Sequence, residues 1–239
     1  MEDGAVDVLV VSPHPDDAEM GCGGTVIGLG RAGHSVALCY LTRGEMGSRG
    51  DIETRAAETR EAARILGARD YTYADIPDAA LFNTTENRLK VVSIIRRYKP
   101  RMMLGPYHKS LHPDHVQASQ LVRDAVYLSG LLRIDTAQER HRPQRVLYYP
   151  LHPKFEPTLV VDISDHFEHK MMAIRAYRSQ FHDPERPDAP QTLLSAPDFL
   201  DRLEAQSRQF GALIGRRYGE GFRINLPLPV RQPSELLRL

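Results

Sequence analysis

Short apolar runs alternate with longer amphipathic segments over the first 130 residues, and this alternation limits the folds that the chain can adopt. Residues 8–11, 35–41, 71–74 and 102–104 have the length and the β-branched or aromatic content of buried strands. The segments between them have the spacing of apolar residues that is typical of helices. This order predicts an α/β, Rossmann-like fold, in which helices sandwich a mostly parallel sheet.

Helix boundaries can be placed from capping residues. Asp51 is expected to cap a helix that stops at Gly67, and Asn83 with Glu86 resembles a capping box for a helix that ends before Pro100. Beyond about residue 140 the pattern is less regular, with strands expected over 145–149 and 159–163 and helices over 165–180 and 197–213. We expect one domain over 1–239 with a Pro-rich tail from 227.

Composition excludes several classes of protein. The chain has 31 basic and 31 acidic residues, so nothing in its net charge favours binding to nucleic acid or to a membrane surface. No apolar run approaches the roughly 20 residues that span a bilayer. The acidic start does not resemble a secretory signal, and the two cysteines, Cys22 and Cys39, form no disulfide framework. We therefore expect a cytoplasmic protein.

Two polar clusters follow two of the expected strands. The first contains His14, Asp16 and Asp17, and the second is the segment His112-Pro113-Asp114-His115. In open parallel sheets, ligands bind beyond the carboxyl ends of the strands, where both clusters fall. Imidazole and carboxylate groups are zinc ligands, and a catalytic zinc site needs three of them with one position left for water.

The spacing within each cluster suggests which residues bind the metal. His14 and Asp17 lie three apart in one tight loop, and His115 is the best third ligand because Pro113 can open a helix that carries it. Asp16 is then free to accept a proton from the attacking water. His112 is the complementary candidate, able as imidazolium to donate a hydrogen bond to the tetrahedral intermediate. Asp114 can orient a histidine or cap the helix.

Residues 28–33 match the glycine pattern of dinucleotide-binding proteins. That motif requires its first glycine directly after a strand, at the start of a helix. Here the glycines fall late in the first expected helix, where they permit close packing or end it. We do not expect a dinucleotide site.

The two clusters, written PHPDDAEMGCGG and HPDH, resemble the signatures of the PIG-L/LmbE family of zinc-dependent N-acetylglucosamine deacetylases. Further blocks (LTRGEMGSRG, IPDAAL, HRPQRVLYYP, AYRSQF, SAPDFL and GEGF) are similar to the bacillithiol-pathway branch of this family. The resemblance implies removal of the acetyl group from N-acetylglucosaminyl malate and a homo-oligomer, commonly a hexamer. It supports one Zn²⁺ on His14, Asp17 and His115, with Asp16 as base and His112 as its partner acid; a His/Asp/His site also admits another divalent metal.

The resemblance also implies substrate contacts. Arg55 falls on an arginine expected to contact the sugar or its appendage, and Glu45 and Asp78 match positions implicated in binding sugar hydroxyls. A loop salt bridge or a turn cap is the structural alternative for Glu45 and Asp78. The position before HPDH, often basic in close relatives, is Leu111 here, and Lys109 or His108 are the nearby substitutes. The tyrosine expected to assist the oxyanion can be Tyr107, Tyr177 or Tyr218.

Three functions remain open at this point. The first is the deacetylation of N-acetylglucosaminyl malate, and the second is the same chemistry on another N-acetylglucosamine conjugate or a chitooligosaccharide. The third, from another class, is a non-catalytic sugar- or nucleotide-binding protein on the same fold.

Overall fold

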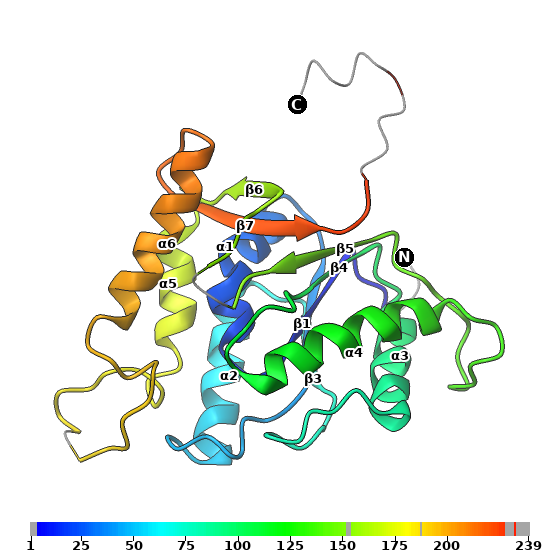
Figure 1. The fold of residues 1–239 in the computed structure, drawn as a ribbon, viewed down its shortest axis with the longest axis horizontal. Helices are drawn as coiled ribbons and strands as arrows, with labels where there is room; N and C mark the ends of the chain where they lie inside the picture. The colour runs from blue at the N-terminus through cyan, green and yellow to red at the C-terminus, as the bar shows by residue number, and fades with distance from the viewer. Residues whose placement is uncertain (1–3, 152–153, 187, 228–231, 233–239) are drawn as a thin grey trace.

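The computed structural model describes residues 4–151, 154–186, 188–227 and 232 (Figure 1). The elements, in chain order, are β1 (Val8–Ser12), α1 (Asp17–Arg31), β2 (Val36–Tyr40), α2 (Ile52–Leu66), β3 (Asp70–Tyr73), α3 (Thr85–Tyr98), β4 (Met102–Pro106), α4 (Pro113–Ser129), β5 (Arg145–Tyr149), β6 (Leu159–Asp162), α5 (Phe167–Arg175), α6 (Phe199–Leu213) and β7 (Gly219–Ile224).

One seven-stranded sheet organises the molecule, in the order β3-β2-β1-β4-β5-β7-β6. The first five of these strands are parallel, and β7 pairs antiparallel with both β5 and β6. This confirms the α/β fold with a mostly parallel sheet. The chain runs outward from β1 through β2 to β3 and then crosses to β4 on the other side of β1. The carboxyl ends of β1 and β4 therefore flank the topological switch point, where open α/β sheets bind ligands.

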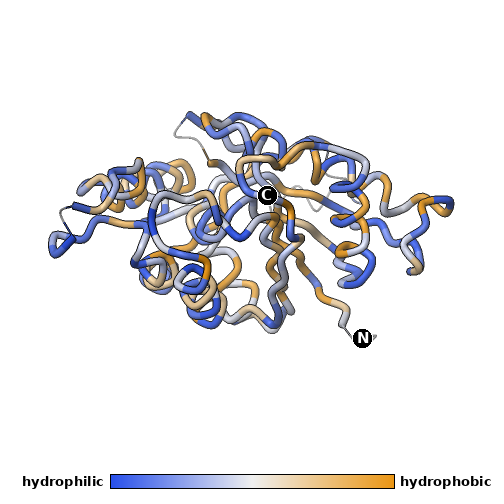
Figure 2. Tube along the Cα trace, turned by 90° about the horizontal axis from the view of Figure 1, so that it is seen from below, coloured by the Kyte–Doolittle hydropathy of each residue, from blue (hydrophilic) through white to orange (hydrophobic). Residues whose placement is uncertain are grey.

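Two apolar layers hold helices on the two faces of the sheet. Because side chains alternate along a strand, Leu9 and Val11 pack with α3 and α4, whereas Val8 and Val10 pack with α1 and α2. A third cluster joins α5 and α6 to the edge of this core. Figure 2 shows the hydrophobic segments concentrated in the middle of the molecule, where the strands run.

Local signals were confirmed at most helix ends but not at all of them. Asp51 accepts the N–H of Thr54 and Gly67 ends α2 in the left-handed region, as expected. The cap of α3 is wrong by one residue: Thr84, not Asn83, accepts a helical N–H, and the side chain of Asn83 binds Asp124 instead. The glycines of the dinucleotide-like motif lie at the end of α1, so its structural requirement is not met.

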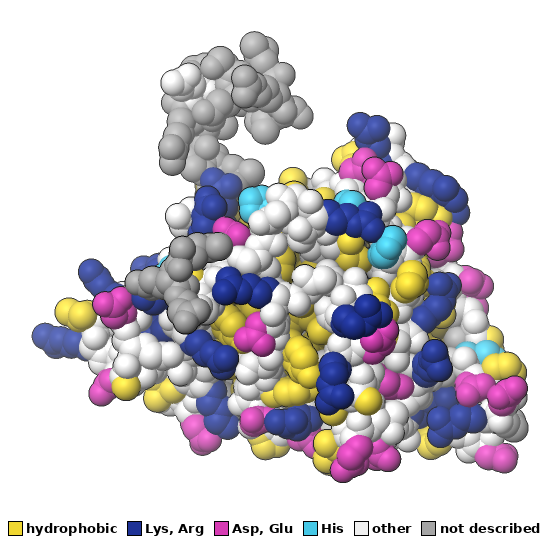
Figure 3. Space-filling model, turned by 180° about the vertical axis from the view of Figure 1, so that it is seen from behind, with side chains coloured by type: hydrophobic (Ala, Val, Ile, Leu, Met, Phe, Trp, Pro, Cys, Tyr) yellow, Lys and Arg dark blue, Asp and Glu magenta, His cyan; other side chains and the backbone are white. Residues whose placement is uncertain are grey.

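The second half departs further from expectation. Helix α5 ends at Arg175, five residues earlier than expected, because Tyr177, Ser179 and Gln180 bind tertiary partners instead of continuing the helix. Strand β7 was not expected. The Pro-rich tail falls largely outside the described residues. No helix in the described part of the chain is long and apolar enough to cross a membrane. Basic and acidic side chains are interspersed over the face drawn in Figure 3.

Candidate metal centre

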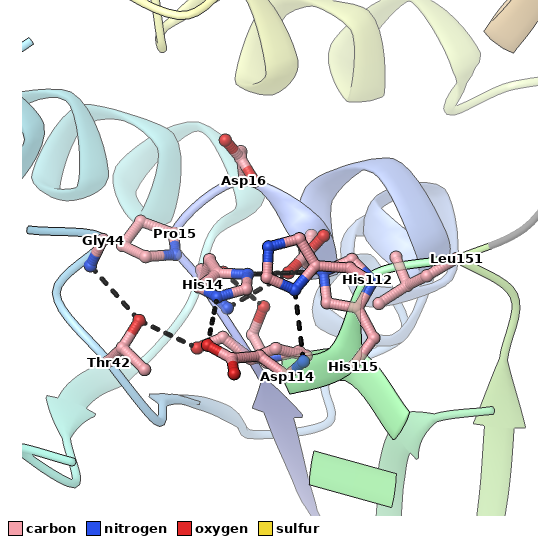
Figure 4. A network of polar contacts seen from close by, with 12 residues as sticks. His14, Pro15, Asp16, Thr42, Gly44, His112, Asp114, His115 and Leu151 are labelled. Atoms are coloured by element: carbon pink, nitrogen blue, oxygen red, sulfur yellow. Dashed lines mark hydrogen bonds and ion pairs between the residues drawn. The ribbon is translucent and has the colours of Figure 1, made fainter. Parts of the chain in front are cut away.

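The two polar clusters meet at the switch point of the sheet. His14 and Asp17 belong to the loop after β1 and the first turn of α1, and His115 lies in the first turn of α4 (Figure 4). Pro113 occupies the start of α4, as predicted, with His112 as the cap residue. Residues about a hundred apart in the chain are thus brought together because two neighbouring parallel strands end side by side.

Three ligand atoms form a nearly equilateral triangle. His14 Nδ1 lies 3.1 Å from Asp17 Oδ2 and 3.3 Å from His115 Nε2. Asp17 Oδ2 lies 3.2 Å from His115 Nε2. Zinc bonds of about 2.0–2.1 Å at tetrahedral angles place ligand atoms about 3.3 Å apart. The triangle therefore fits a divalent ion, and three protein ligands leave a fourth position for water.

Two carboxylates lie behind His14. Its Nε2 atom is 3.2 Å from Asp78 Oδ1 and 3.3 Å from Asp114 Oδ2. A carboxylate accepts a hydrogen bond but cannot donate one when ionised, so the proton of a neutral His14 belongs on Nε2. Nδ1 is then left with a free lone pair facing Asp17 and His115. Carboxylates in this position orient metal-binding histidines and increase their basicity.

The second histidine is oriented by a hydroxyl. Ser110 Oγ lies 3.0 Å from Nδ1 of His115 and within hydrogen-bond distance of the Leu151 carbonyl. Because the hydroxyl can donate to that carbonyl, it can accept the Nδ1 proton of His115. Nε2 of His115 then also presents a lone pair to the centre of the triangle. Both histidines are prepared to bind a cation.

Charges in the cluster act strongly on one another. Burial by itself lowers the pKa of His14, but hydrogen bonds with Asp114, Asp17 and Asp78 outweigh it and raise this pKa well above the ordinary value. Burial likewise works to raise the pKa of Asp17, yet His115 and His14 lower it far below the usual range. The carboxylates thus favour a positive charge at this point, which a proton or a metal cation can supply.

A compact loop fixes the first cluster. Ser12 Oγ donates to the carbonyl of His14 and accepts the N–H of Ala18, and Asp17 Oδ2 accepts the N–H of His14. Asp16 has a φ of 108°, a strained conformation for a residue other than glycine. Such strain persists only where surrounding contacts hold it, and it clusters at functional sites.

Asp16 is buried beside a cation. In Figure 4 its carboxylate is turned away from the three imidazoles. Arg55 Nη2 donates to the carbonyl of Pro15 at 2.8 Å and lies 3.5 Å from Asp16 Oδ2. Burial raises the pKa of Asp16 well above its usual range, with the Arg55 charge opposing the shift and the Asp17 charge adding to it. Arg55 is itself buried and supports the Asp16 loop, and the sugar contact implied for it stays a prediction.

His112 stands at the exposed rim of the cluster. Its Nδ1 accepts the backbone N–H of Asp114, so Nε2 carries the proton of the neutral ring. Burial, together with the charges of His14 and His115, lowers the pKa of His112. In this geometry His112 can donate a hydrogen bond through Nε2, and its expected role as an imidazolium donor stays a prediction.

The remaining expected contacts form a network between loops. Glu45 accepts the N–H of Asp78, and Asp78 accepts the N–H of Met46. These bonds tie residues 43–47 to the loop that carries Asp78, which in turn contacts His14. The sequence indicated both residues, but not that Asp78 would contact His14; the sugar contacts implied for them stay a prediction.

The three tyrosines considered for the oxyanion have other surroundings. The hydroxyl of Tyr177 donates to Glu19, and that of Tyr218 donates to Glu204. The ring of Tyr107 packs against His108 and Phe155. Within the described part of the chain, none of these three hydroxyls contacts the triangle of His14, Asp17 and His115.

A groove of about 450 Å³ opens beside the triangle. Asp17 and His115 line it, together with residues of α6 from Phe199 to Gln209 and of the loop before this helix. Its size is that of a small-molecule site. No feature of the sequence had predicted it, because its walls come from four distant segments.

The chain is similar to known proteins in both sequence and structure. Residues 9–126 match the family model described as PIG-L: GlcNAc-PI de-N-acetylase. The chain is 33% identical to diacetylchitobiose deacetylase of Thermococcus kodakarensis, over 90% of this chain and 82% of the relative. It is 30% identical to a probable N-acetyl-alpha-D-glucosaminyl L-malate deacetylase 2 of Bacillus cereus, over 72% of this chain and 83% of that relative. The crystal structure of a conserved protein from Thermus thermophilus has a TM-score of 0.86 and 38% identity, covering 95% of this chain and 98% of that one.

The comparisons do not favour the bacillithiol-pathway branch over other branches of the family. The diacetylchitobiose deacetylase matches more of this chain, and at higher identity, than the malate deacetylase does. The coarser expectation is confirmed: the chain belongs to the PIG-L family of de-N-acetylases.

Proposed function

We propose that this protein is a metal-dependent N-deacetylase that acts on N-acetylglucosamine within a short neutral oligosaccharide such as diacetylchitobiose. The observation that carries the proposal is the triangle of His14, Asp17 and His115, with both imidazoles oriented to present lone pairs. Zn²⁺ is the proposed ion, because two nitrogen ligands and one oxygen ligand at these distances suit it.

The zinc ion and the side chains of the protein have different roles in the proposed reaction. When bound, zinc lowers the pKa of water and polarises a carbonyl. Asp16, next to Asp17 in the chain and with a raised pKa, is the proposed general base, a role that requires its carboxylate to rotate toward the imidazoles from which it is turned away in Figure 4. His112, through its Nε2–H, is the proposed donor to the oxygen that becomes negative in the transition state. Arg55 holds the loop that carries Asp16.

The substrate assignment differs from our first expectation. The malate conjugate carries two carboxylates that need cations, and Leu111, directly before the HPDH segment, is uncharged and 82% exposed, which leaves Lys109 and His108 as the nearest candidates in the chain. Diacetylchitobiose has no charge to neutralise. Both Leu111 and the similarity to the diacetylchitobiose deacetylase support the neutral substrate.

The test is acetate release by zinc-loaded protein from diacetylchitobiose, N-acetylglucosaminyl malate and free N-acetylglucosamine. We expect the highest kcat/KM with diacetylchitobiose; a higher value with the malate conjugate would overturn the substrate assignment. Asp16→Asn should retain zinc and lose about 10²–10⁴-fold in kcat. If Asp16→Asn is fully active, Asp16 is not the base; if wild type releases no acetate but binds sugar, the protein is a binding protein.

The ligand assignment has a separate readout. His14→Ala, Asp17→Ala and His115→Ala should each lose bound zinc in elemental analysis, whereas Asp16→Asn should not. Undiminished zinc in all three alanine variants would contradict the site. The homo-oligomer remains a prediction, which light scattering of the purified chain tests.

A further inference from the structure

The groove begins at the candidate metal centre. Asp17 and His115, two corners of the triangle, are among its lining residues. An amide carbonyl placed at the triangle therefore has one of its two substituents directed along the groove. The amine side of that amide carries the sugar, and the other side carries the acyl chain.

The walls of the groove are mainly hydrocarbon. Leu151 follows β5, Leu193 and Leu194 precede α6, and Phe199 and Leu203 project from α6. Leu193 is 65% exposed, so a large apolar side chain faces solvent beside a ligand site. Covering such a surface with an apolar ligand is favourable in proportion to the area removed from water.

The polar groups of the groove do not form a sugar site. Arg202 lines it, but Asp198 binds both Nε and Nη2 of this guanidinium. Apart from Asp17, His115 and Arg202, the hydrogen-bonding side chains among the described lining residues are Gln206 and Gln209. The polar residues expected to meet sugar hydroxyls, such as Glu45 and Asp78, do not line the groove.

We propose that the groove binds the acyl chain of the substrate, so that the enzyme removes saturated acyl groups of about four to eight carbons from amino sugars in addition to acetyl. This inference rests on the proposed function. The part of α6 that lines the groove, from Phe199 to Gln209, rises about 15 Å at 1.5 Å per residue. An extended chain covers about 1.1–1.2 Å per bond, so eight carbons fit within that length.

The reaction is the same hydrolysis for every chain length. The oxygen of water bonds to the acyl carbon, the C–N bond breaks, and the nitrogen leaves with a proton from the water. The products are the free amino sugar and the carboxylate of the acyl chain, with the second proton released to solvent. No oxidant or second substrate is needed.

The experiment compares N-acetyl, N-butyryl, N-hexanoyl and N-octanoyl forms of one amino-sugar substrate with the zinc-loaded full chain. We expect kcat/KM to rise at least tenfold from acetyl to hexanoyl, below a ceiling of about 200-fold if each of four methylenes contributes about 0.8 kcal/mol. If acetyl is removed but kcat/KM falls with chain length, the groove assignment is wrong and the proposed function stands. If no acyl group is removed, both are wrong.

Two leucines of similar exposure provide matched variants. Leu193, 65% exposed, lines the groove, and Leu213, 62% exposed at the end of α6, does not. Leu193→Asp should reduce the ratio of hexanoyl to acetyl turnover at least threefold, whereas Leu213→Asp should leave this ratio unchanged. Leu203→Trp, which narrows the groove, should reduce the same ratio.

Two other occupants are distinguished by the same variants. If the groove holds the group attached to the sugar, Leu193→Asp alters the response to longer alkyl glycosides of N-acetylglucosamine and not the response to acyl length. If a second subunit covers the groove, Leu193→Asp changes the mass measured by light scattering and leaves the ratio intact. Either result overturns the acyl-chain assignment.

Discussion

Substitution of the two carboxylates behind His14 tests how the chain sets its affinity for zinc. Asp78 Oδ1 and Asp114 Oδ2 lie at nearly the same distance from Nε2, 3.2 and 3.3 Å. They share a single N–H, so removal of one leaves the other to accept the whole bond. The effect of losing both should therefore exceed the product of the two separate effects.

The magnitude follows from this sharing. Loss of the partner of a metal-binding histidine weakens metal affinity by about 10–100-fold. We expect Asp78→Ala and Asp114→Ala each to weaken zinc binding by about threefold to fivefold, or about 1 kcal/mol or less, and the double variant by about 100-fold, or about 2.7 kcal/mol. Asp114→Asn tests the contribution of the negative charge separately from that of the hydrogen bonds. Asp114 Oδ2 contacts both His14 and the N–H of Ala79, and the amide oxygen of asparagine can accept the same bonds.

The assay is competition for zinc with a chromophoric chelator at neutral pH, with circular dichroism to verify folding. Asp124→Asn is the matched control, because Asp124 lies on the same helix α4 as Asp114 but binds Asn83 and not His14. Its zinc affinity should equal that of the wild type. The reasoning is refuted if the double variant binds zinc within threefold of the wild type, or if one single substitution already gives the full loss.

Three further predictions concern stability. Lys170→Met should lower the free energy of unfolding in urea by about 3–5 kcal/mol, because it leaves the buried Glu220 carboxylate without its cation; a change below about 1 kcal/mol would contradict this. Gly21→Ala should cost about 1–3 kcal/mol or more, since a Cβ would overlap the buried ring of Tyr149, and unchanged thermal stability would show that the ring can move. Burial raises the pKa of Glu19, so the folded wild type holds this proton more tightly than the unfolded chain and loses stability as the pH rises above the ordinary value of 4.5. Glu19→Gln cannot ionise, and its stability relative to the wild type should increase as the pH rises above about 4.5; a constant difference would exclude the shift.

Much of the site could be predicted from the sequence, because its residues follow segments that can be recognised as strands. Val8–Val11 and Met102–Leu104 could be recognised as strands by their length and composition. Once they are parallel neighbours, the residues that follow them must meet at one edge of the sheet. The convergence of His14 and His115 needed no further information, and the structure confirms it.

Other features had no local signal. Asp78 contacts His14 because the loop after β3 folds back over the first cluster, and Arg55 reaches the carbonyl of Pro15 from the neighbouring helix. Strand β7 was missed because its buried Glu220 does not fit an apolar pattern. Its carboxylate instead accepts the N–H groups of Gly24 and Thr25 and binds the Lys170 ammonium.

The sequence by itself determined the order of the elements before β7, the fold class and the three side chains that can hold a cation. These depend on interactions within a few residues of chain and on one topological rule for parallel strands. Only the tertiary structure decided which ring nitrogen each histidine presents, which carboxylates stand behind it and where the apolar groove opens. Those features depend on side chains from separate segments that become neighbours when the sheet and its helices pack, and no local pattern of residues encodes such contacts.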